Sequence, residues 1–422
     1  MPQDRALLTA MFNAAVASAD PTRALGAHLP PRPKGRCVVV GAGKGAAQMA
    51  AAFEALWPHP LSGVVVTRHG AGVPCQRIRV MEAAHPVPDE AGLAASAALF
   101  KAVAGLGPDD LVVALISGGG SALLPAPAAG LTLADEIALN TELLRSGAPI
   151  GVMNALRGRI SRIKGGRLAL AAHPAQVVSL IVSDVAGDDP AQVASGPTVA
   201  GQVPDDPLAL ARDYGIALPP RIAAFMADAA TTLAPSPDDP RFAGHRVTLI
   251  ASARQALLAA ADVARAAGLP AHILSDALTG EAQSTGQILA AIATASARGQ
   301  GAFTAPCVLL SGGETTVRLP DSLQPHARGG RNTTCALAMA DGIAGTPITA
   351  LLADTDGIDG HGDHAGGFVD GTSAARLRQL GLPPASALAS HDSAGALAQI
   401  DDLFITGPTG TNVNDFRAIV IR

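Results

Sequence analysis

The chain has 422 residues, of which 48% are hydrophobic, 15% are charged and 3% are aromatic, and its formal net charge is −5. This length is too great for one ordinary hydrophobic core, so two domains are expected. The modest charge, without a long basic run, and the scarcity of aromatic rings argue against nucleic-acid binding. Each long apolar stretch meets a charged residue, Gly or Pro before it reaches a membrane-spanning length, so we expect no membrane helix.

The first segment, MPQDRALLTAMFNAAVASADP, has the short apolar region and small-residue end of a signal peptide. However, Asp4 and Asn13 interrupt it, and Leu8, Met11 and Phe12 fall on one helical face. We therefore predict an amphipathic helix. The four cysteines show no paired ligand spacing, which predicts reduced thiols in a cytoplasmic protein.

Short apolar runs alternate with alanine-rich helical patterns along the rest of the chain. The predicted strands are CVVV, GVVVT, LVVALIS, VVSLIVSD, RVTLIAS, AHILSDA, PCVLLSGG, ITALLADTDG and DLFITG. Strands that are apolar on both faces and separated by helices indicate parallel sheets, so the predicted fold class is α/β. In such sheets ligands bind beyond the carboxyl ends of the strands, where this chain concentrates Gly, Ser, Asp and Thr.

The most linker-like stretch is TTLAPSPDDPRFAGHR, residues 231–246, which is rich in Pro and Asp and precedes a new strand. It predicts an N-terminal domain over residues 1–240 and a C-terminal domain over residues 241–422. Because domains can exchange segments, the terminal helix can belong with either half.

The stretch VVVGAGKGAAQMA places Gly41, Gly43 and Ala46 in a dinucleotide-binding pattern between a strand and a helix. The second strand lacks the acid that an NAD site uses, although Arg68 leaves an NADP site open. Lys44 adds a cation at a helix N-terminus, where free N–H groups and the helix dipole already attract anions. We interpret Lys44 as a contact for phosphate or carboxylate.

The stretch LISGGGSALL ends a strand in three consecutive glycines between two serines. Backbone N–H groups can converge there without obstruction by side chains, which predicts an anion-binding nest formed by Ser117, Gly118, Gly119, Gly120 and Ser121. The stretch LLSGGETTVRL repeats the pattern with Gly312 and Gly313 and adds the carboxylate of Glu314. Two anion-accepting turns predict a polyphosphate ligand in a cleft.

Acidic residues follow the strand VVSLIVSD. Asp184, Asp188 and Asp189 lie within six residues of loop, and a divalent cation such as Mg²⁺ would relieve their repulsion. Asp189 precedes Pro190 and also suits a helix N-cap, so both roles are open for it. A second acidic stretch, ADTDGIDGHGDHAGG, lacks the length and terminal Glu of an EF-hand, and Asp-Gly turns explain about half of it.

The basic counterpart is the stretch MNALRGRISRIKGGRLA, whose cations lie on or just beyond a helix that ends at Gly165 and Gly166. Arg157 and Lys164 are candidates for binding an anionic substrate, although a cation in the last turn of a helix also stabilises the helix dipole. In the later stretch HARGGRNTTCALAMA, Arg331 starts a helix, where the dipole disfavours it. We expect an anionic ligand as its partner.

Together these motifs resemble the MOFRL family of glycerate 2-kinases, the class II glycerate kinases, long labelled hydroxypyruvate reductases. The resemblance spans nearly the whole chain, through GAGKGA, HPVPDEAG, ISGGGSAL, RISRIKGGRLA, SDVAGDDPAQVASGPT, LSDALTGEA, LSGGETTV, RGGRN, DTDGIDG and GPTGTNVND. It implies a Rossmann-like domain and a smaller C-terminal MOFRL-type α/β domain, with the active site in the cleft between them.

The resemblance implies phosphorylation of D-glycerate at the 2-hydroxyl by ATP with Mg²⁺, giving 2-phosphoglycerate. Nests, cations and a metal supply the positioning and charge neutralisation that phosphoryl transfer needs. The implied catalytic residues are Lys44, Asp188 and Arg331. Gly43 and the two glycine stretches would bind the nucleotide, and the remaining roles are substrate binding by Arg157, Lys164 and Asn332, and metal binding by Asp184 and Asp189. Which of Asp184 and Asp188 accepts the hydroxyl proton stays open.

The chain also departs from the family pattern at several positions. The residues found in place of the expected ones are Gly158, Arg159, Ala253, Thr333, Thr334 and His391. These departures leave open another small hydroxy acid, such as an aldonate, as the acceptor. An NAD(P)H-dependent hydroxypyruvate reductase is a further alternative, and a homodimer is possible.

Overall fold

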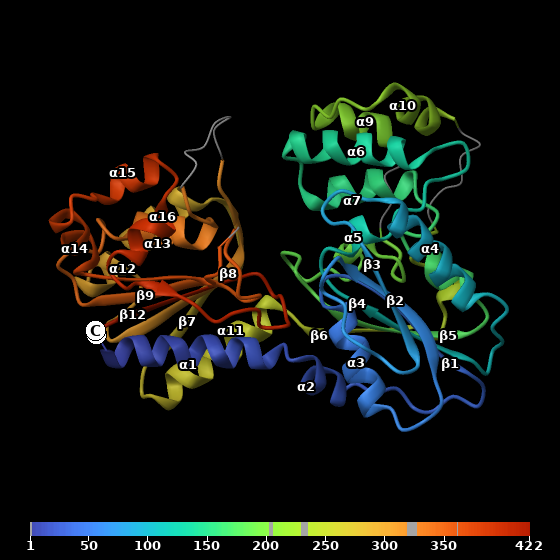
Figure 1. Ribbon diagram of the computed structural model, residues 1–422, viewed down its shortest axis with the longest axis horizontal. Helices are drawn as coiled ribbons and strands as arrows, with labels where there is room; N and C mark the ends of the chain where they lie inside the picture. Colours follow the sequence, from blue (N-terminus) through green and yellow to red (C-terminus); the bar gives the residue numbers. More distant parts are fainter. Residues whose placement is uncertain (1, 202–205, 229–234, 319–326, 361) are drawn as a thin grey trace. The chain divides into compact units, whose positions relative to one another are not determined.

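The computed structural model describes residues 2–201, 206–228, 235–318, 327–360 and 362–422 (Figure 1). The chain divides into two compact units, each with its own six-stranded sheet. We call residues 21–250 the parallel-sheet unit, and residues 1–20 with 251–422 the mixed-sheet unit. Both units combine a sheet with flanking helices, which confirms the predicted α/β fold class.

These units differ from the predicted domain ranges at two places. The strand β6 (Arg246–Ala251) is an edge strand of the first sheet, so the parallel-sheet unit extends to residue 250 rather than 240. The helix α1 (Pro2–Ser18) packs on α11 (Ala253–Ala266) and on strands of the second sheet, so it belongs to the mixed-sheet unit. Of the predicted linker, residues 231–234 lie outside the described residues, and a short 3₁₀ turn at Pro240–Phe242 precedes β6.

The sheet of the parallel-sheet unit has the strand order β3-β2-β1-β4-β5-β6. Its first five strands are β1 (Cys37–Ala42), β2 (Ser62–Arg68), β3 (Ile78–Ala83), β4 (Leu111–Ile116) and β5 (Gln176–Val182). The pairings from β3 through β5 are parallel. The order reverses between β1 and β4, and in sheets of this topology ligands bind at such a reversal, beyond the carboxyl ends of the strands.

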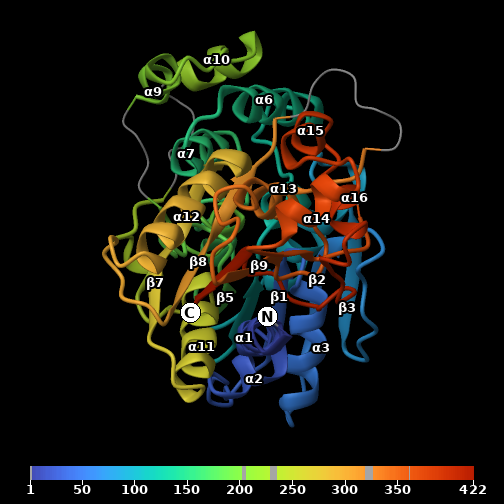
Figure 2. The ribbon, with the colours of Figure 1, turned by 90° about the vertical axis from the view of Figure 1, so that its left-hand side faces the viewer.

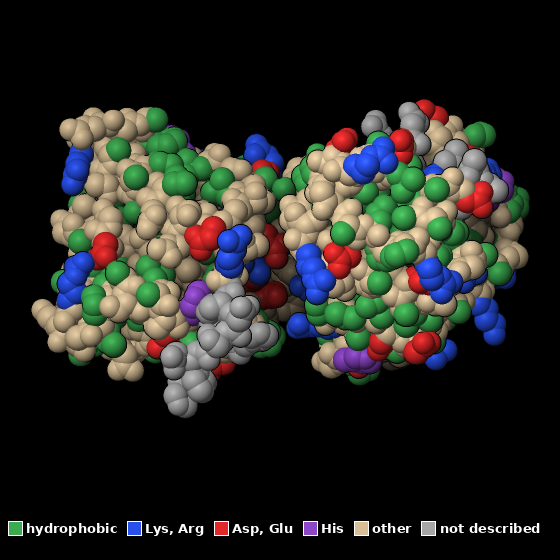
Figure 3. Space-filling view, turned by 90° about the horizontal axis from the view of Figure 1, so that it is seen from above, with side chains coloured by type: hydrophobic (Ala, Val, Ile, Leu, Met, Phe, Trp, Pro, Cys, Tyr) green, Lys and Arg blue, Asp and Glu red, His purple; other side chains and the backbone are tan. Residues whose placement is uncertain are grey.

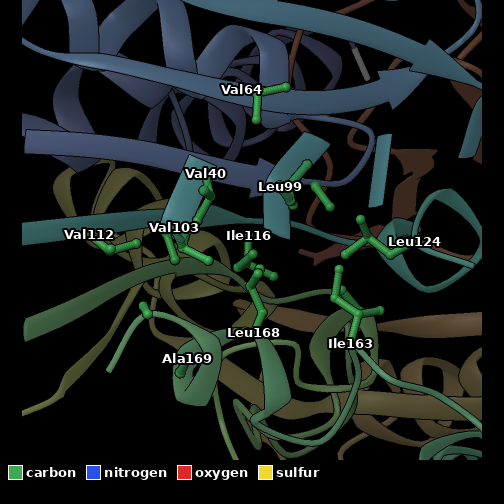
Figure 4. Close-up of a cluster of buried hydrophobic side chains, with 14 of the residues drawn as sticks. Val40, Val64, Leu99, Val103, Val112, Ile116, Leu124, Ile163, Leu168 and Ala169 are labelled. Atoms are coloured by element: carbon green, nitrogen blue, oxygen red, sulfur yellow. The ribbon is translucent and has the colours of Figure 1, made fainter. Parts of the chain in front are cut away.

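Helices cover this sheet and extend beyond it. They are α2 (Pro21–Gly26), α3 (Ala46–Leu56), α4 (Glu90–Val103), α5 (Gly120–Leu123), α6 (Leu133–Ser146), α7 (Ile150–Arg159), α8 (Arg167–Ala171), α9 (Pro207–Asp213) and α10 (Pro220–Ala227). Figure 4 shows the main core, where strand valines and Ile116 meet side chains of α4 and α8. A separate core under α6, α7, α9 and α10 contains Leu139, Leu156 and Ile222.

The sheet of the mixed-sheet unit has the order β11-β10-β9-β12-β8-β7. Its strands are β7 (Ala271–Glu281), β8 (Cys307–Thr316), β9 (Ile348–Asp354), β10 (Gly366–Asp370), β11 (Leu403–Phe404) and β12 (Asp415–Ile421). Only the β7–β8 pairing among these is parallel. The expectation of a parallel sheet is therefore wrong for this unit, because strands buried on both faces look alike in sequence whichever way they run.

Helices cover both faces of the mixed sheet (Figures 1 and 2). One face carries α12 (Ala282–Ala297), α13 (Arg331–Met339), α14 (Ser373–Gln379), α15 (Pro384–Ala389) and α16 (Ser393–Ala398), and the other carries α1 and α11. The predicted first helix is confirmed, and its apolar face is buried. The Phe12 ring lies 5.0 Å from the ring of Phe404 and 5.6 Å from that of Phe416.

The surface fits the expectations drawn from composition. None of the described helices is both long and apolar enough to cross a membrane. On the face shown in Figure 3, the described Lys and Arg side chains are interspersed with Asp and Glu side chains rather than gathered in one basic patch.

Candidate active site

Two turns meet at the point where the strand order of the parallel sheet reverses. After β1 the chain passes through Gly43 and Lys44 into α3, and after β4 it passes through the triglycine turn, residues 117–121, into α5. The Lys44 N–H donates to the Gly118 carbonyl at 2.8 Å, and the Gly45 N–H donates to Ser117 Oγ at 3.0 Å. The structure therefore brings the Lys44 turn and the triglycine turn together.

Three side chains approach the bare backbone of the triglycine turn. A Cβ atom on Gly118 would overlap the carboxylate of Asp184. A Cβ atom on Gly119, whose φ is +77°, would lie 3.0 Å from Lys44 Cγ and 3.1 Å from His85 Nε2. A cation, a carboxylate and an imidazole thus converge on two glycines that have to lack side chains.

The charges of these groups differ in how they are compensated. Lys44 is partly exposed and makes no ion pair within the described ranges of the chain. Burial, together with the positive charges of Lys44 and Arg68, lowers the pKa of His85 to about 4. His85 is therefore neutral at pH 7 and can exchange hydrogen bonds without adding charge.

A chain of hydroxyl, amide and guanidinium groups leads away from the triglycine turn to α7. Ser121 Oγ and Ser195 Oγ share a hydrogen bond of 2.7 Å, and Ser195 Oγ donates to Asn154 Oδ1 at 2.8 Å. Arg157 donates to the same Asn154 oxygen at 3.0 Å and to Asn140 Oδ1 at 2.8 Å. Burial lowers the pKa of Arg157 to about 10. The predicted substrate residue Arg157 is thus linked to the turn.

The backbone beside Ser121 is strained. Ala194 and Ser195 adopt left-handed φ values of 53° and 60°, which cost non-glycine residues of order 1–3 kcal/mol each. A Cβ atom on Gly120 would lie 2.7 Å from Ala194 Cβ, so the strained segment packs directly on the triglycine turn. Strain of this kind persists where the surrounding structure fixes it, which is common at functional sites.

Lys164 differs from Lys44 because its charge is paired within the protein. Its side chain is 1% exposed, its ammonium pairs with Glu136 at 2.6 Å, and it donates to the Leu124 carbonyl at 2.9 Å. The protein's own oxygens thus hold this cation inside the fold. Its position gives Lys164 a structural role and argues against the predicted contact with substrate.

The acidic loop after β5 divides into separate roles. Asp189 accepts hydrogen bonds from the Ala191 N–H at 3.0 Å and from the Gln192 side chain at 3.4 Å, which form a local turn. No helix begins at Pro190, and the next short 3₁₀ turn starts at Val193, so Asp189 is not the helix N-cap that the sequence left open. Asp188 has a left-handed φ of 55°. The described residues contain no group of three or more His, Cys, Asp or Glu side chains disposed to hold a metal. Metal binding by Asp184 and Asp189 stays a prediction.

The second glycine stretch is not a turn. Strand β8 runs without a break through Gly312, Gly313 and Glu314. A Cβ atom on Gly313, whose φ is +109°, would overlap the backbone of Leu278 in β7, so this glycine permits close approach of two strands. The predicted repeat of the triglycine geometry is therefore wrong, and a phosphate-binding role for this stretch has no nest to support it.

In the mixed-sheet unit, three acidic side chains surround Arg331 at the start of α13. Its guanidinium lies 2.6 Å from Asp415, 2.5 Å from Asp354 and 3.4 Å from Glu314. Burial lowers the pKa of Arg331, but the three negative charges outweigh it and raise the pKa. Arg331 thus has protein partners for the positive charge that the sequence assigned to a ligand.

Of the buried groups behind Arg331, Asp415 and Arg417 were not predicted from the sequence, whereas Asn332 was predicted to bind substrate. Asp415 also pairs with the fully buried Arg417. Burial raises the pKa of Asp415, but the charges of Arg417 and Arg331 outweigh it and lower the pKa. Asn332 donates to Asp415 at 2.8 Å, while its own Oδ1 is buried without a hydrogen-bond partner. The sequence signals that could have indicated this cluster are Asp354 at the end of β9 and Asp415 at the start of β12.

Thr333, one of the departures from the family pattern, helps to cap α13. Its hydroxyl donates to Asp359 at 2.9 Å, and Asp359 also accepts the backbone N–H groups of Asn332 and Thr333. Burial raises the pKa of Asp359 despite these hydrogen bonds. This departure therefore supports the helix start and does not point to a ligand.

Comparisons with known proteins agree with this architecture. A domain described as a domain of unknown function, DUF4147, matches residues 7–227, and the MOFRL family matches residues 307–415. A D-glycerate 2-kinase from Thermotoga maritima is 36% identical over 400 residues, which cover 94% of this chain and 93% of that protein. A protein from Agrobacterium vitis, provisionally named a hydroxypyruvate reductase, is 52% identical over 421 residues, which cover 99% of this chain and 94% of that protein.

The crystal structure of a glycerate kinase from Thermotoga maritima aligns over 100% of both chains, with 33% identity and a TM-score of 0.87. The fold and these relatives define an enzyme of the phosphotransferase class that uses an alcohol group as acceptor. The chain belongs to the MOFRL family of glycerate kinases, which confirms the resemblance seen in its motifs. The predicted position of the active site between the two domains stays a prediction.

Proposed function

We propose that the protein phosphorylates D-glycerate at the 2-hydroxyl with ATP and Mg²⁺, giving 2-phosphoglycerate. The observation that carries the proposal is the convergence of Lys44 and Asp184 on the triglycine turn, where the strand order of the parallel sheet reverses. The names of the family relatives support glycerate as the acceptor.

The proposed roles follow from the chemistry of each group. The triglycine turn offers unobstructed backbone to phosphate oxygens, and Lys44, which no carboxylate in the described ranges neutralises, would offset the negative charge on the transferring phosphoryl group. The glycerate 2-oxygen attacks the γ-phosphorus as the bond to the ADP oxygen breaks. We assign the hydroxyl proton to Asp188.

The residues at the turn fit a magnesium ion. Mg²⁺ is bound through one or two carboxylates together with phosphate oxygens, and the carboxylate of Asp184 lies against Gly118. We propose that Asp184 would hold the metal beside a phosphate bound at the turn. When bound, Mg²⁺ would supply positive charge to the β- and γ-phosphate oxygens.

The reductase alternative rests on the dinucleotide pattern between β1 and α3, and on the name of the relative from Agrobacterium vitis. In a dinucleotide site the second glycine lets the pyrophosphate approach the backbone. Here a Cβ atom on Gly43 would overlap Ser117, so this glycine is needed for the packing of the two turns. The glycine pattern is thus explained by packing and is not by itself evidence for a dinucleotide.

The test is to incubate the purified protein with ATP, Mg²⁺ and D-glycerate and to locate the phosphate of the product by phosphorus NMR. We expect ADP and 2-phosphoglycerate. Formation of 3-phosphoglycerate would overturn the regiochemistry, and absence of ADP with every short hydroxy acid would overturn the kinase. Oxidation of NADH or NADPH by hydroxypyruvate would support the reductase instead.

A further inference from the structure

Arg159, the last residue of α7, is a buried cation for which the described residues supply no partner. The residue is 7% exposed, and its Nη1 atom is buried and has no hydrogen bond. Arg159 also makes no ion pair with any described residue of the chain. Because burial of an uncompensated charge is strongly unfavourable, the natural interpretation is that an anion completes this position.

A second arginine, Arg167, lies close to Arg159 and adds to the positive charge there. Arg167 donates through Nη1 to the carbonyls of Gly158 at 2.9 Å and Lys164 at 3.0 Å. Burial, followed by the positive charge of Arg159, lowers the pKa of Arg167 to about 10. Arg157 donates hydrogen bonds to the amide oxygens of Asn140 and Asn154, and Lys164 pairs with Glu136. Among the described residues, neither Arg159 nor Arg167 has an ion pair.

Gly158, which precedes Arg159, is not closely packed against a neighbouring side chain. Gly158 is buried, yet a Cβ atom built on it would meet nothing within 4 Å. The space beside the residue that precedes Arg159 is therefore not filled by a side chain from elsewhere in the fold.

The arginine segment is also tied to the triglycine turn. The Gly165 N–H donates to the Ser195 carbonyl at 3.0 Å, and the Gly166 N–H donates to the Gly196 carbonyl at 2.7 Å. Ser195 in turn shares its hydroxyl hydrogen bond with Ser121. The cation pair and the proposed phosphate turn thus belong to one hydrogen-bonded substructure of the parallel-sheet unit.

We propose that Arg159, with Arg167 beside it, binds the carboxylate of the hydroxy-acid acceptor and so determines which acceptors the enzyme takes. The identity of the anion rests on the proposed function, because a glycerate kinase must hold a carboxylate near the reacting hydroxyl. The planar fork of a guanidinium matches a carboxylate with two parallel hydrogen bonds, which a point charge cannot do.

The test compares Arg159→Gln and Arg159→Lys with Arg162→Gln as the matched control. Arg162 is an exposed arginine of the same segment, and its Nε donates to the Pro127 carbonyl at 2.9 Å. We expect Arg159→Gln to raise the KM for D-glycerate about 10- to 100-fold, the range for loss of a charged hydrogen bond, with the KM for ATP unchanged. Arg159→Lys should fall between, and the control should match the wild type. An unchanged KM for D-glycerate in Arg159→Gln would overturn the proposal.

Direct binding separates this inference from the proposed reaction. Sodium D-glycerate should raise the melting temperature of the wild-type protein, whereas glycerol, which lacks the carboxylate, should not, and Arg159→Gln should abolish the shift. This result would support the site even if no phosphoryl transfer were found. If glycerate still stabilised Arg159→Gln fully while inorganic phosphate no longer did, the site would bind phosphate and the carboxylate assignment would be overturned.

Stability without ligand provides a last check. Removal of an unpaired buried charge should leave Arg159→Met at least as stable as the wild-type protein in the absence of any anion. A merely structural arginine would give the opposite result. A clear fall in the melting temperature of ligand-free Arg159→Met would therefore overturn the proposal.

Discussion

Lys44 and Arg331 were predicted to do the same work, yet the structure gives them opposite surroundings. Lys44 borders the triglycine turn and has no acidic partner among the described residues. Arg331 lies against Asp415, Asp354 and Glu314. An unpaired cation can give its full charge to a ligand, whereas a ligand at Arg331 has to compete with three carboxylates that are already in place. Sequence position alone could not distinguish the two.

The largest expected effect is on stability and tests the ion pairs around Arg331. Asp415→Asn removes the charge that holds both Arg331 and the fully buried Arg417. Breaking a buried ion pair leaves a charge uncompensated, so the free energy of unfolding should fall by about 3–5 kcal/mol. Urea denaturation measures this.

The control for that variant is Asp262→Asn in α11 of the same unit, where the side chain is 76% exposed and pairs only with Arg265. An exposed pair contributes about 0.2–1 kcal/mol, so this variant should remain close to the wild type. If both variants lost the same stability, the Arg331 cluster would not be the tightly coupled group described above.

The next largest effect is on activity and tests Lys44. Lys44→Met should lower kcat/KM by about 100-fold, because an oriented charge at the transferring phosphoryl group is lost. The free energy of unfolding should stay within about 1 kcal/mol, since no ion pair is broken. Steady-state kinetics and denaturation of the same preparation measure both quantities, with the exposed Lys101→Met of α4 as control. Retention of full activity would remove Lys44 from the site.

A smaller effect is expected at the turn itself. Gly118→Ala places a methyl group where the Asp184 carboxylate lies, and the backbone of Gly118 does not require a positive φ. The carboxylate has to move, which should lower kcat by about tenfold, because misplacement of a catalytic group by an ångström is costly. The control is Gly26→Ala, where a Cβ atom meets nothing within 4 Å. Equal activity of the two variants would show that the position of Asp184 does not matter.

The smallest effect concerns pH. The pKa of His85 is about 4 in the folded protein, below its ordinary value of 6.5, because of burial and nearby positive charge. The unfolded chain therefore binds more protons between these values, and the stability contributed by neutral His85 is present above pH 6.5 and is lost as the pH falls toward 4.

His85→Asn should flatten the dependence of stability on pH in this window, measured as the melting temperature from pH 4 to 7. The exposed His28→Asn should leave the dependence unchanged. An identical slope in wild type and His85→Asn would show that His85 titrates normally.

Two near-identical stretches show what the sequence could predict and what it could not. LISGGGSALL and LLSGGETTVRL both place glycines after an apolar run. The nine predicted strands are present, as are the turns at Lys44 and at the triglycine stretch, but β3, β10 and β12 were not predicted. Glycines in β8 remain within a strand because β7 and β12 pair with it on both sides. Such pairing depends on segments far along the chain, which a local pattern does not contain.

The same limit applies to the side chains of the site. His85, Asn154 and Asp415 lie in stretches that were singled out in the sequence, yet no role was predicted for them, because their importance comes from burial and from neighbours that the fold supplies. Lys164 is the opposite case. It lies in a basic motif that was predicted to bind substrate, but its charge is paired with Glu136 inside the fold. Residue type and spacing predicted where anions would be attracted, and tertiary contacts decide which cations are free to attract them.

The packing of α1 has a consequence for how the chain is made. Phe12 lies between Phe404 and Phe416, and Asp4 pairs with Arg422, so the first helix meets partners that are synthesised after the parallel-sheet unit. The parallel-sheet unit between them is one continuous segment and can fold while synthesis continues. During that time α1 has an apolar face and no partner, and the mixed-sheet unit closes only when its final strand, β12, has left the ribosome.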